Sequence, residues 1–429
     1  MKLNVKTHFL FLLHCALKVL ICSAVGLVLL ILVYLIPTQK TDDNVRKSAQ
    51  EFFDYSAFNW LIGENTDSLI LDNYTDSWIL LESAYDTRSD ENSVWQNAVA
   101  VKNSTINEFI HSKNAILLNH YLKNTPFDGT ETYPRYWHGY LIFTKPLFFF
   151  IHYRDFRIIN AVVQFLLFAV LLFLLIKKRL FFFILPYIVS CLLLKPVELF
   201  LSMQFSACYY VCTISCIVLL LFGEKITVKQ LCSLFLYTGI ALAYFDFLTY
   251  PLVTVGIPAV MYFSITKAQN LKTCLSHLMG IFVCWGFGYG FMWFLKWLWA
   301  SVILRQNIFF DAYDSIMYRT VHESYSRWET VKMNFDNFFN NSFITTLFVV
   351  LIVAELFLAI FTFIRSKKNT ENIISVILPF AILFVLPFLW YVVLTNHSYL
   401  HSWFTYRSLM VSSFALSCLL AKLTLHFNS

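Results

Sequence analysis

The sequence is poor in charge. Only 14% of its 429 residues are Asp, Glu, Lys or Arg, whereas 58% are hydrophobic. A soluble domain carries roughly 25% charged residues, so this chain has too few solvated groups to cover a water-facing surface. Many apolar runs reach the about 18 residues that cross hydrocarbon about 30 Å thick. The composition therefore excludes a soluble globular protein and predicts an all-α integral membrane protein.

Several signatures of soluble enzymes are also missing. The chain has no Walker A loop, no glycine-rich dinucleotide motif, no GxSxG and no Cys-His zinc pattern. Its cysteines lie in or beside apolar runs, so no disulfide framework is predicted in the polar segments. Basic residues form no stripe of the kind that binds nucleic acid, and no nucleic-acid partner is expected. No metal site is predicted and no resident cofactor is certain, although a divalent cation is left open.

The positions of the positive charges orient the apolar runs. Lysines and arginines cluster in short loops between the runs, and such loops are typically cytoplasmic. About ten spans are expected, with both termini in the cytoplasm and the active face outside the plasma membrane. The predicted spans are 19–36, 157–176, 180–195, 205–222, 230–246, 250–266, 274–300, 343–364, 373–394 and 408–425.

A long segment between the first two spans is the main polar part of the chain. It has more acidic than basic residues, as expected of an extracytoplasmic loop. Its last apolar stretch, 140–153, is short and contains Pro146, so it is expected to lie along the membrane as a juxtamembrane helix. The expected organisation is 1–36 (N-terminus and first span), 37–156 (outer loop), 157–303 (helical bundle), 304–342 (second outer segment) and 343–429 (last three spans).

Five polar and aromatic clusters then fall on the outer face, and nothing comparable falls on the inner one. These clusters are "YPRYWHG" (133–139), "KPVELFLSMQ" (195–204), "YFDFLTYP" (244–251), the segment 304–342 and "NHSYLHSWFTYR" (396–407). Side chains of this kind suit a site that binds a phosphate or a sugar. We therefore expect the clusters to share one surface.

Acidic residues of the outer loop are candidates for a general base. Asp72 and Asp76 would point the same way on a helix, and aromatic surroundings would raise their pKa toward neutrality. The alternative is that Asp72 or Asn73 simply caps that helix. Asp42 and Asp43, directly behind the first span, are rival candidates.

Two clusters carry the candidates for substrate binding. Arg135 suits a bidentate grip on phosphate, and His138 can supply a proton or a hydrogen bond. The aromatic residues around them would equally suit a membrane-interface belt. His397 and His401 are four residues apart, which is a spacing that zinc sites use, but no acidic ligand lies near them in the sequence.

The end of the last cluster adds Tyr406 and Arg407 to this set. Together with the two histidines they could form a phosphate or sugar pocket, or they could anchor the chain at the interface. Asp246 is a lone acid at the outer end of a span, where Lys195 or Arg407 would be a natural partner. A structural ion pair and a contact to the ligand are both left open, so Asp246 and Lys195 also count as candidates for substrate binding. Glu355 is the clearest charge inside a span, and its role is left open.

The architecture resembles the C-type membrane glycosyltransferases. "LDNYTDSWIL", "RYWHGY", "FDFLTYP" and "NHSYLHSWFTYR" also resemble stretches of multi-span membrane proteins from low-GC Gram-positive bacteria. The resemblance implies sugar transfer from a polyprenyl-phosphate donor to a glycan, lipid or protein acceptor in the cell envelope. It also implies an acidic catalytic residue in the first outer loop, which maps to Asp76 or Asp72. In the superfamily that acid lies closer to the first span, where this chain has Asp42 and Asp43.

Two other classes of function compete with this one. A transporter or flippase for a lipid-linked or polysaccharide substrate would need charged groups along a path through the midplane. A structural membrane protein would use the outer loop to bind cell-wall polymer.

Overall fold

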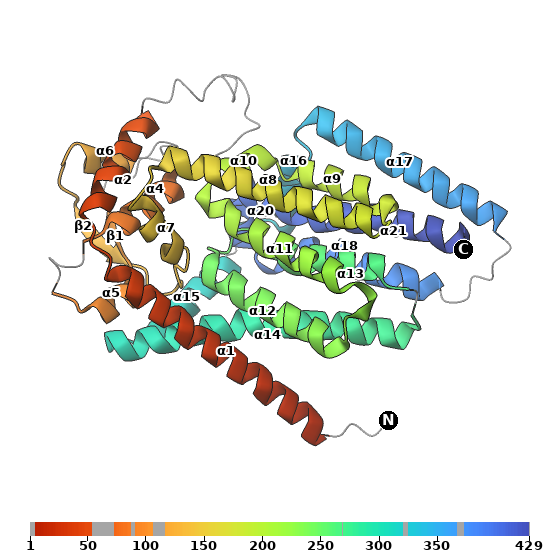
Figure 1. Cartoon of the computed structure of the whole chain (residues 1–429), viewed down its shortest axis with the longest axis horizontal. Coiled ribbons are helices and arrows are strands. Elements are labelled where there is room, and N and C mark those ends of the chain that lie inside the picture. The colour runs from red at the N-terminus through yellow and green to blue at the C-terminus, as the bar shows by residue number, and fades with distance from the viewer. Residues whose placement is uncertain are drawn as a thin grey trace.

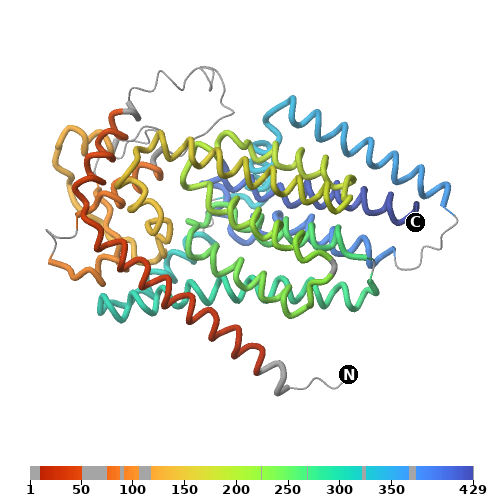
Figure 2. Tube along the Cα trace, viewed as in Figure 1, coloured from red at the N-terminus to blue at the C-terminus, as the bar shows by residue number. Residues whose placement is uncertain are grey.

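The structure is a bundle of apolar helices with a polar cap at one end (Figure 1). This computed structural model describes residues 5–53, 73–86, 91–105, 116–267, 269–320, 325–366 and 373–428. Asp72, Lys367 and Lys368 lie outside the described residues. The tube in Figure 2 shows both termini at the end of the bundle opposite the cap. We call the capped end the polar end and the end that carries the termini the basic end.

Eight of the described helices are long and apolar enough to cross a membrane. The chain is therefore a multi-pass, all-α membrane protein. These spans are Leu10–Tyr34 of α1 (Val5–Tyr34), α8 (Tyr153–Lys177), α11 (Met203–Phe222), α12 (Val228–Phe245), α14 (Leu271–Leu304), α17 (Ser342–Arg365), α18 (Ile373–Val393) and Ser402–Asn428, which joins α20 (Ser402–Thr405), η4 (Tyr406–Leu409) and α21 (Met410–Asn428).

Two of the ten predicted spans are shorter than expected. Instead of 180–195, the apolar helical segment is Phe181–Leu193, and instead of 250–266 it is α13 (Leu252–Ile265). Lys195 ends the first of them by taking a left-handed backbone conformation, with φ of 55°. The last span is longer than predicted, because it begins at Ser402 and includes residues that were expected in a loop.

The polar cap is built largely by the segment between α1 and α8. Its strands pair antiparallel, with Lys102 opposite Thr132. Its described elements are α2 (Gln39–Phe53), α4 (Asn73–Ala84), α5 (Val94–Ala100), β1 (Lys102–Thr105), α6 (Ile116–Leu122), β2 (Gly129–Thr132) and α7 (Leu141–Phe148). At about 1.5 Å per residue, α7 is too short to cross a membrane by itself.

The remaining described helices complete the cap or turn the chain. They are η2 (Phe181–Phe183), α9 (Ile184–Leu193), α10 (Pro196–Leu201), η3 (Gly223–Lys225), α15 (Ile308–Thr320), α16 (Arg327–Phe338) and α19 (Thr395–Leu400).

Glycine allows the closest helix contact in the bundle. A Cβ placed on Gly239 of α12 would lie 2.2 Å from the Trp285 carbonyl oxygen of α14, and one on Gly288 would lie 2.3 Å from that of Leu236. No side chain fits at such a distance, so α12 and α14 touch backbone to backbone. At the start of α12 the hydrogen bonds are local, because Thr227 and Gln230 form a capping box there.

Candidate functional site

The clusters that the sequence placed on one face do meet, at the polar end. The loop 133–139 lies against the loop 244–251: the Gly139 amide donates to the Tyr244 carbonyl at 2.9 Å. The rings of His138 and Phe247 are 5.5 Å apart. The first loop connects β2 to α7 and the second connects α12 to α13, so their contact joins the cap to the bundle.

The cluster 396–407 joins the same layer. His397 Nε2 hydrogen-bonds the Leu248 carbonyl at 2.9 Å. Asn334 of α16 donates to the Ser398 carbonyl at 2.9 Å, and the Thr405 hydroxyl donates to the Asn334 side chain at 2.7 Å. Residues far apart in the sequence therefore form one hydrogen-bonded polar layer.

Arg407 lies in that layer as the partner of a buried acid. Its guanidinium bonds Glu198 of α10, and both side chains are almost fully buried, at 0% and 1% exposed. The Tyr406 hydroxyl donates to the same carboxylate at 3.3 Å, and Lys195 Nζ lies 5.0 Å from the centre of the Tyr406 ring. Burial lowers the pKa of Lys195. In this structure Tyr406 and Arg407 connect α10 to the last span and do not face an open site.

The sequence led us to expect Lys195 or Arg407 as the partner of Asp246, but Asp246 is bonded to neither. Its carboxylate accepts from the Thr249 amide at 2.9 Å and from the Thr249 hydroxyl. Burial raises the pKa of Asp246. The expectation was wrong because Glu198, in the same outer cluster as Lys195, takes the arginine, while Asp246 turns the chain between α12 and α13.

Asp76 anchors the start of another helix. It lies on α4, as predicted, and is 1% exposed. Its carboxylate accepts from the backbone amides of Met203 and Gln204 at 3.0 and 3.1 Å, and also from the hydroxyl of Tyr153. Acids are favoured at this position because the N-terminus of α11 is its positive end. Burial nevertheless raises the pKa of Asp76.

The other candidate bases are more accessible. Asp42 is half-buried on α2, where it accepts from Arg46 at 2.8 Å and from the Tyr121 hydroxyl. Asp43 is exposed. Both lie in the first turns after α1, where the family resemblance would put the acid.

A buried cluster next to the loop 133–139 was missed from the sequence. The Tyr140 hydroxyl bonds Glu82, and it lies 2.6 Å from Nδ1 of His138, whose backbone φ is 53°. Lys145 Nζ donates to the Ser83 carbonyl at 3.0 Å, and burial lowers its pKa to about 8. The signal was an acid, Glu82, inside the apolar stretch "WILLESAY", together with a lysine inside a short apolar helix.

One part of the layer is a stack of two tyrosine rings between two arginines, which we call the cationic surface. The Arg135 guanidinium lies 4.6 Å from the Tyr133 ring centre, and that ring stacks on Tyr136 with centres 5.2 Å apart. Arg319 of α15 lies 5.8 Å from the Tyr136 ring centre. Burial, with the nearby charge of Arg319, lowers the pKa of His401 to about 4, so its imidazole is neutral at pH 7.

The charge of this surface is only partly balanced. Arg135 bonds Asp311 at 2.6 Å, with side chains 19% and 43% exposed. Within the described ranges no carboxylate lies at ion-pair distance from Arg319, which is half-buried. Nothing in the local sequence around Arg319 marks it as a site residue, so it was not predicted. The surface can therefore accept an anion.

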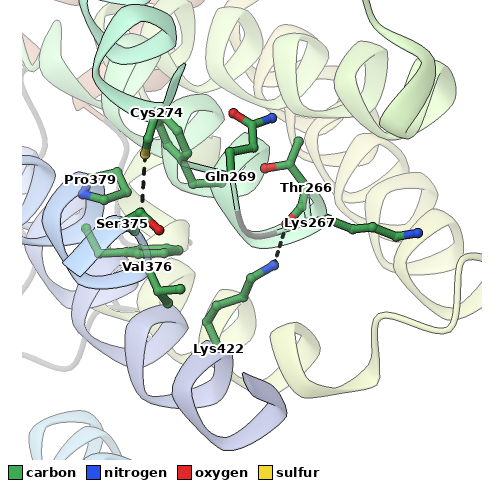
Figure 3. A pocket seen from close by; sticks show the side chains of 10 residues that line it. Thr266, Lys267, Gln269, Cys274, Ser375, Val376, Pro379 and Lys422 are labelled. Carbon is green, nitrogen blue, oxygen red and sulfur yellow. Dashed lines mark hydrogen bonds between the residues drawn. The ribbon is translucent and has the colours of Figure 1, made fainter. Parts of the chain in front are cut away.

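The basic end has a different kind of cavity. Figure 3 shows Lys422 of α21 pointing at the α13–α14 connection, where its Nζ donates to the carbonyls of Ser264 and Thr266 at 2.8 and 2.6 Å. The enclosed space is only about 20 Å³, enough for about one water molecule.

Neither end holds a set of metal ligands in the described part of the chain. No group of three or more His, Cys, Asp or Glu residues is placed there to hold an ion. His397 and His401 have ring centres 4.9 Å apart, but His397 is already bonded to a backbone carbonyl.

Comparison with known proteins leaves the geometry as the guide to function. No family model, no curated protein and no solved structure matches this chain.

Proposed function

We propose that this protein is a membrane glycosyltransferase that moves a sugar from a polyprenyl-phosphate donor to an extracytoplasmic glycan, lipid or protein. The observation that supports it is the cationic surface at the polar end, where Arg135 and Arg319 flank the stacked rings of Tyr133 and Tyr136. A surface of this kind combines groups for a phosphate and for a sugar. It lies beside apolar helices along which a polyprenyl tail can rest.

Each group of the surface has a part in this proposal. Arg319 binds the phosphate of the donor and stabilises the negative charge that grows as the sugar leaves. His401, neutral at pH 7, hydrogen-bonds the phosphate or the sugar. The partly exposed ring of Tyr133 faces the sugar, and the buried Tyr136 ring supports it from behind. Arg407, Tyr406, Lys195, Asp246, His138 and His397 act as positioning residues, because they hold the loops that present the surface.

The acceptor hydroxyl needs a base, and the first outer loop supplies the acids. Asp76 and Asp72 are our sequence-based assignments, with Asp42 and Asp43 as rivals. The contacts of Asp76 with α11 give it a second, structural role, so loss of transfer in Asp76→Asn must be read beside its effect on folding. Asp43→Asn has no such ambiguity, because Asp43 is exposed.

The proposed function requires a particular membrane topology. Ten crossings follow if Phe181–Leu193 and α13 return the chain through the membrane in addition to the eight long spans. The polar end is then extracytoplasmic and both termini are cytoplasmic. A cysteine introduced at Asp128 should react with an impermeant thiol reagent in intact cells, and one at Arg365 should not. Labelling at 365 without labelling at 128 would reverse the orientation.

Charged groups inside the spans do not favour the transporter alternative. Glu355 accepts from the Ser417 hydroxyl at 2.6 Å, and Lys296 donates to the Val99 carbonyl at 2.8 Å. Each of these charges has a partner within the protein that accounts for its presence in the bundle.

The test is sugar transfer by the purified protein in lipid, using a short-chain prenyl-phosphate sugar. Arg319→Gln should lower turnover by about 10- to 100-fold, since it removes a charge-assisted contact to phosphate. Arg327→Gln is the matched control, because Arg327 is an exposed arginine on α16 of the same cap. Equal turnover in the wild type and Arg319→Gln would remove the cationic surface from the active site.

A further inference from the structure

A groove at the basic end lies between the end of α11 and the start of α12. It has a volume of about 330 Å³, and Val218, Phe222 and Leu234 form its apolar wall. Neighbouring apolar side chains are exposed, with Leu221 at 61% and Tyr237 at 45%. In a membrane protein such a face is turned to lipid, so the groove opens sideways into the bilayer.

One rim of this groove is polar. Lys229 and Ser233 line it from α12, one helical turn apart on the same face. Lys18 of α1 donates to the Ser233 hydroxyl at 3.0 Å, and its Nζ lies 5.4 Å from the centre of the Tyr237 ring. Lys18 is a cation within the apolar run Leu10–Tyr34, where a charge is costly unless a partner satisfies it.

The positive charge at the rim is not balanced by a carboxylate among the described side chains. Among the described side chains, no carboxylate lies within ion-pair distance of Lys18 or Lys229. An ammonium group has three hydrogens to donate, and a hydroxyl and a ring satisfy only part of that capacity for Lys18. The groove thus pairs an apolar channel open to the bilayer with Lys229 on its polar rim and with Lys18, which is bonded to Ser233 of that rim.

We propose that this groove binds one anionic phospholipid. An acyl chain lies along Val218, Phe222 and Leu234, and the phosphate sits between Lys18 and Lys229. Basic pockets between membrane helices on one side of a bilayer are known to select anionic headgroups. The apolar wall and the lateral opening favour a lipid over a free anion, which would have no use for them.

Such a lipid would also hold α1 in place. The Lys18–Ser233 bond is a polar link from α1 to α12 near the basic end, and much of this half of α1 is exposed, including Leu12, Leu13 and Leu17. A phosphate that bridges Lys18 and Lys229 ties α1 to α12 a second time. Because α1 leads into the polar cap, the lipid would steady the cap from the opposite end. This inference does not depend on the proposed function.

Native mass spectrometry of the purified full-length chain can test the site. The protein is released from nanodiscs that contain equal amounts of phosphatidylglycerol and phosphatidylcholine with the same acyl chains. The wild type should keep one phosphatidylglycerol, with a preference over phosphatidylcholine of about tenfold. Lys18→Gln/Lys229→Gln should lose that preference.

A matched control removes the same charge elsewhere at the basic end. Lys272→Gln/Arg365→Gln neutralises two exposed basic residues outside the groove and should keep the preference. Leu234→Trp, which fills the groove and leaves both lysines, should lose the bound lipid although the protein still elutes as a folded species. Equal retention of phosphatidylglycerol in the wild type and Lys18→Gln/Lys229→Gln would overturn the proposal, as would retention in Leu234→Trp.

Discussion

The two ends of this bundle use charge in different ways. At the polar end, charged side chains are buried and bonded to groups far away in the sequence, such as Arg407 to Glu198 and Asp76 to the start of α11. At the basic end, Lys225, Lys229 and Lys272 are exposed. The difference teaches that charge at the polar end is built into specific tertiary contacts, whereas much of the charge at the basic end is left on the surface.

Breaking the buried ion pair at the polar end should lower the stability of the protein more than any other change proposed here. Arg407→Ala removes the guanidinium that is bonded to the buried Glu198, and removal of one partner of such a pair costs about 3–5 kcal/mol. Arg407→Lys should also destabilise, because one ammonium cannot replace the guanidinium fork. Thermal unfolding in detergent measures both, with Arg365→Ala at the basic end as the control that should unfold like the wild type. Equal stability of Arg407→Ala and Arg365→Ala would end the distinction between the two ends.

Asp76→Asn should have the next largest effect. The variant keeps the shape of the side chain but loses the charge that binds two backbone amides at the start of α11, at a cost of about 1.5–3 kcal/mol. Hydrogen exchange should rise in the first turn of α11 and stay unchanged at the start of α12, where Thr227 forms the cap. If exchange and melting are unchanged while transfer is abolished, Asp76 is a base and not an anchor.

A substitution at the basic end should cost less. Lys422→Met removes two donated hydrogen bonds to the carbonyls of Ser264 and Thr266 and keeps the apolar stem. The expected loss is about 1 kcal/mol, because Thr266 borders a small cavity that water can enter. A loss as large as that of Arg407→Ala would show that the basic end is as specifically built as the polar end.

The last expected effect is a dependence of stability on pH at the polar end. The pKa of His401 falls from an ordinary 6.5 to about 4 in the folded chain, mainly because the ring is buried. Between these values the unfolded chain binds a proton that the folded chain does not, so stability present above pH 6.5 is lost as the pH falls toward 4. The melting temperature at pH 5 should be lower than at pH 7.5 by about 2 °C or more. His401→Gln should reduce that difference, and an unchanged difference would contradict the assignment.

The sequence predicted the membrane class and the gathering of the polar clusters, because hydrophobic run length and the distribution of charge are local properties. It did not predict the partners. Asp246 was matched with Lys195 or Arg407, but Glu198 takes Arg407, since pairing depends on how α10 meets the last span. It missed Arg319 and Glu82 for the same reason: only the tertiary fold brings Arg319 over Tyr136 and Glu82 beside Tyr140. The predicted length of the span 180–195 was wrong because Lys195 has a left-handed backbone conformation, which ends the helical segment within the apolar run.

The central claim is that the cationic surface binds a lipid phosphate. It is tested most directly by equilibrium binding of a polyprenyl phosphate and of the polyprenol that lacks the phosphate, to the wild type and to Arg319→Gln. The account predicts that the wild type binds the phosphate form at least about tenfold more tightly than the polyprenol, and that Arg319→Gln binds the two alike. Equal affinity of the wild type for the two lipids, or an undiminished preference in Arg319→Gln, would contradict it.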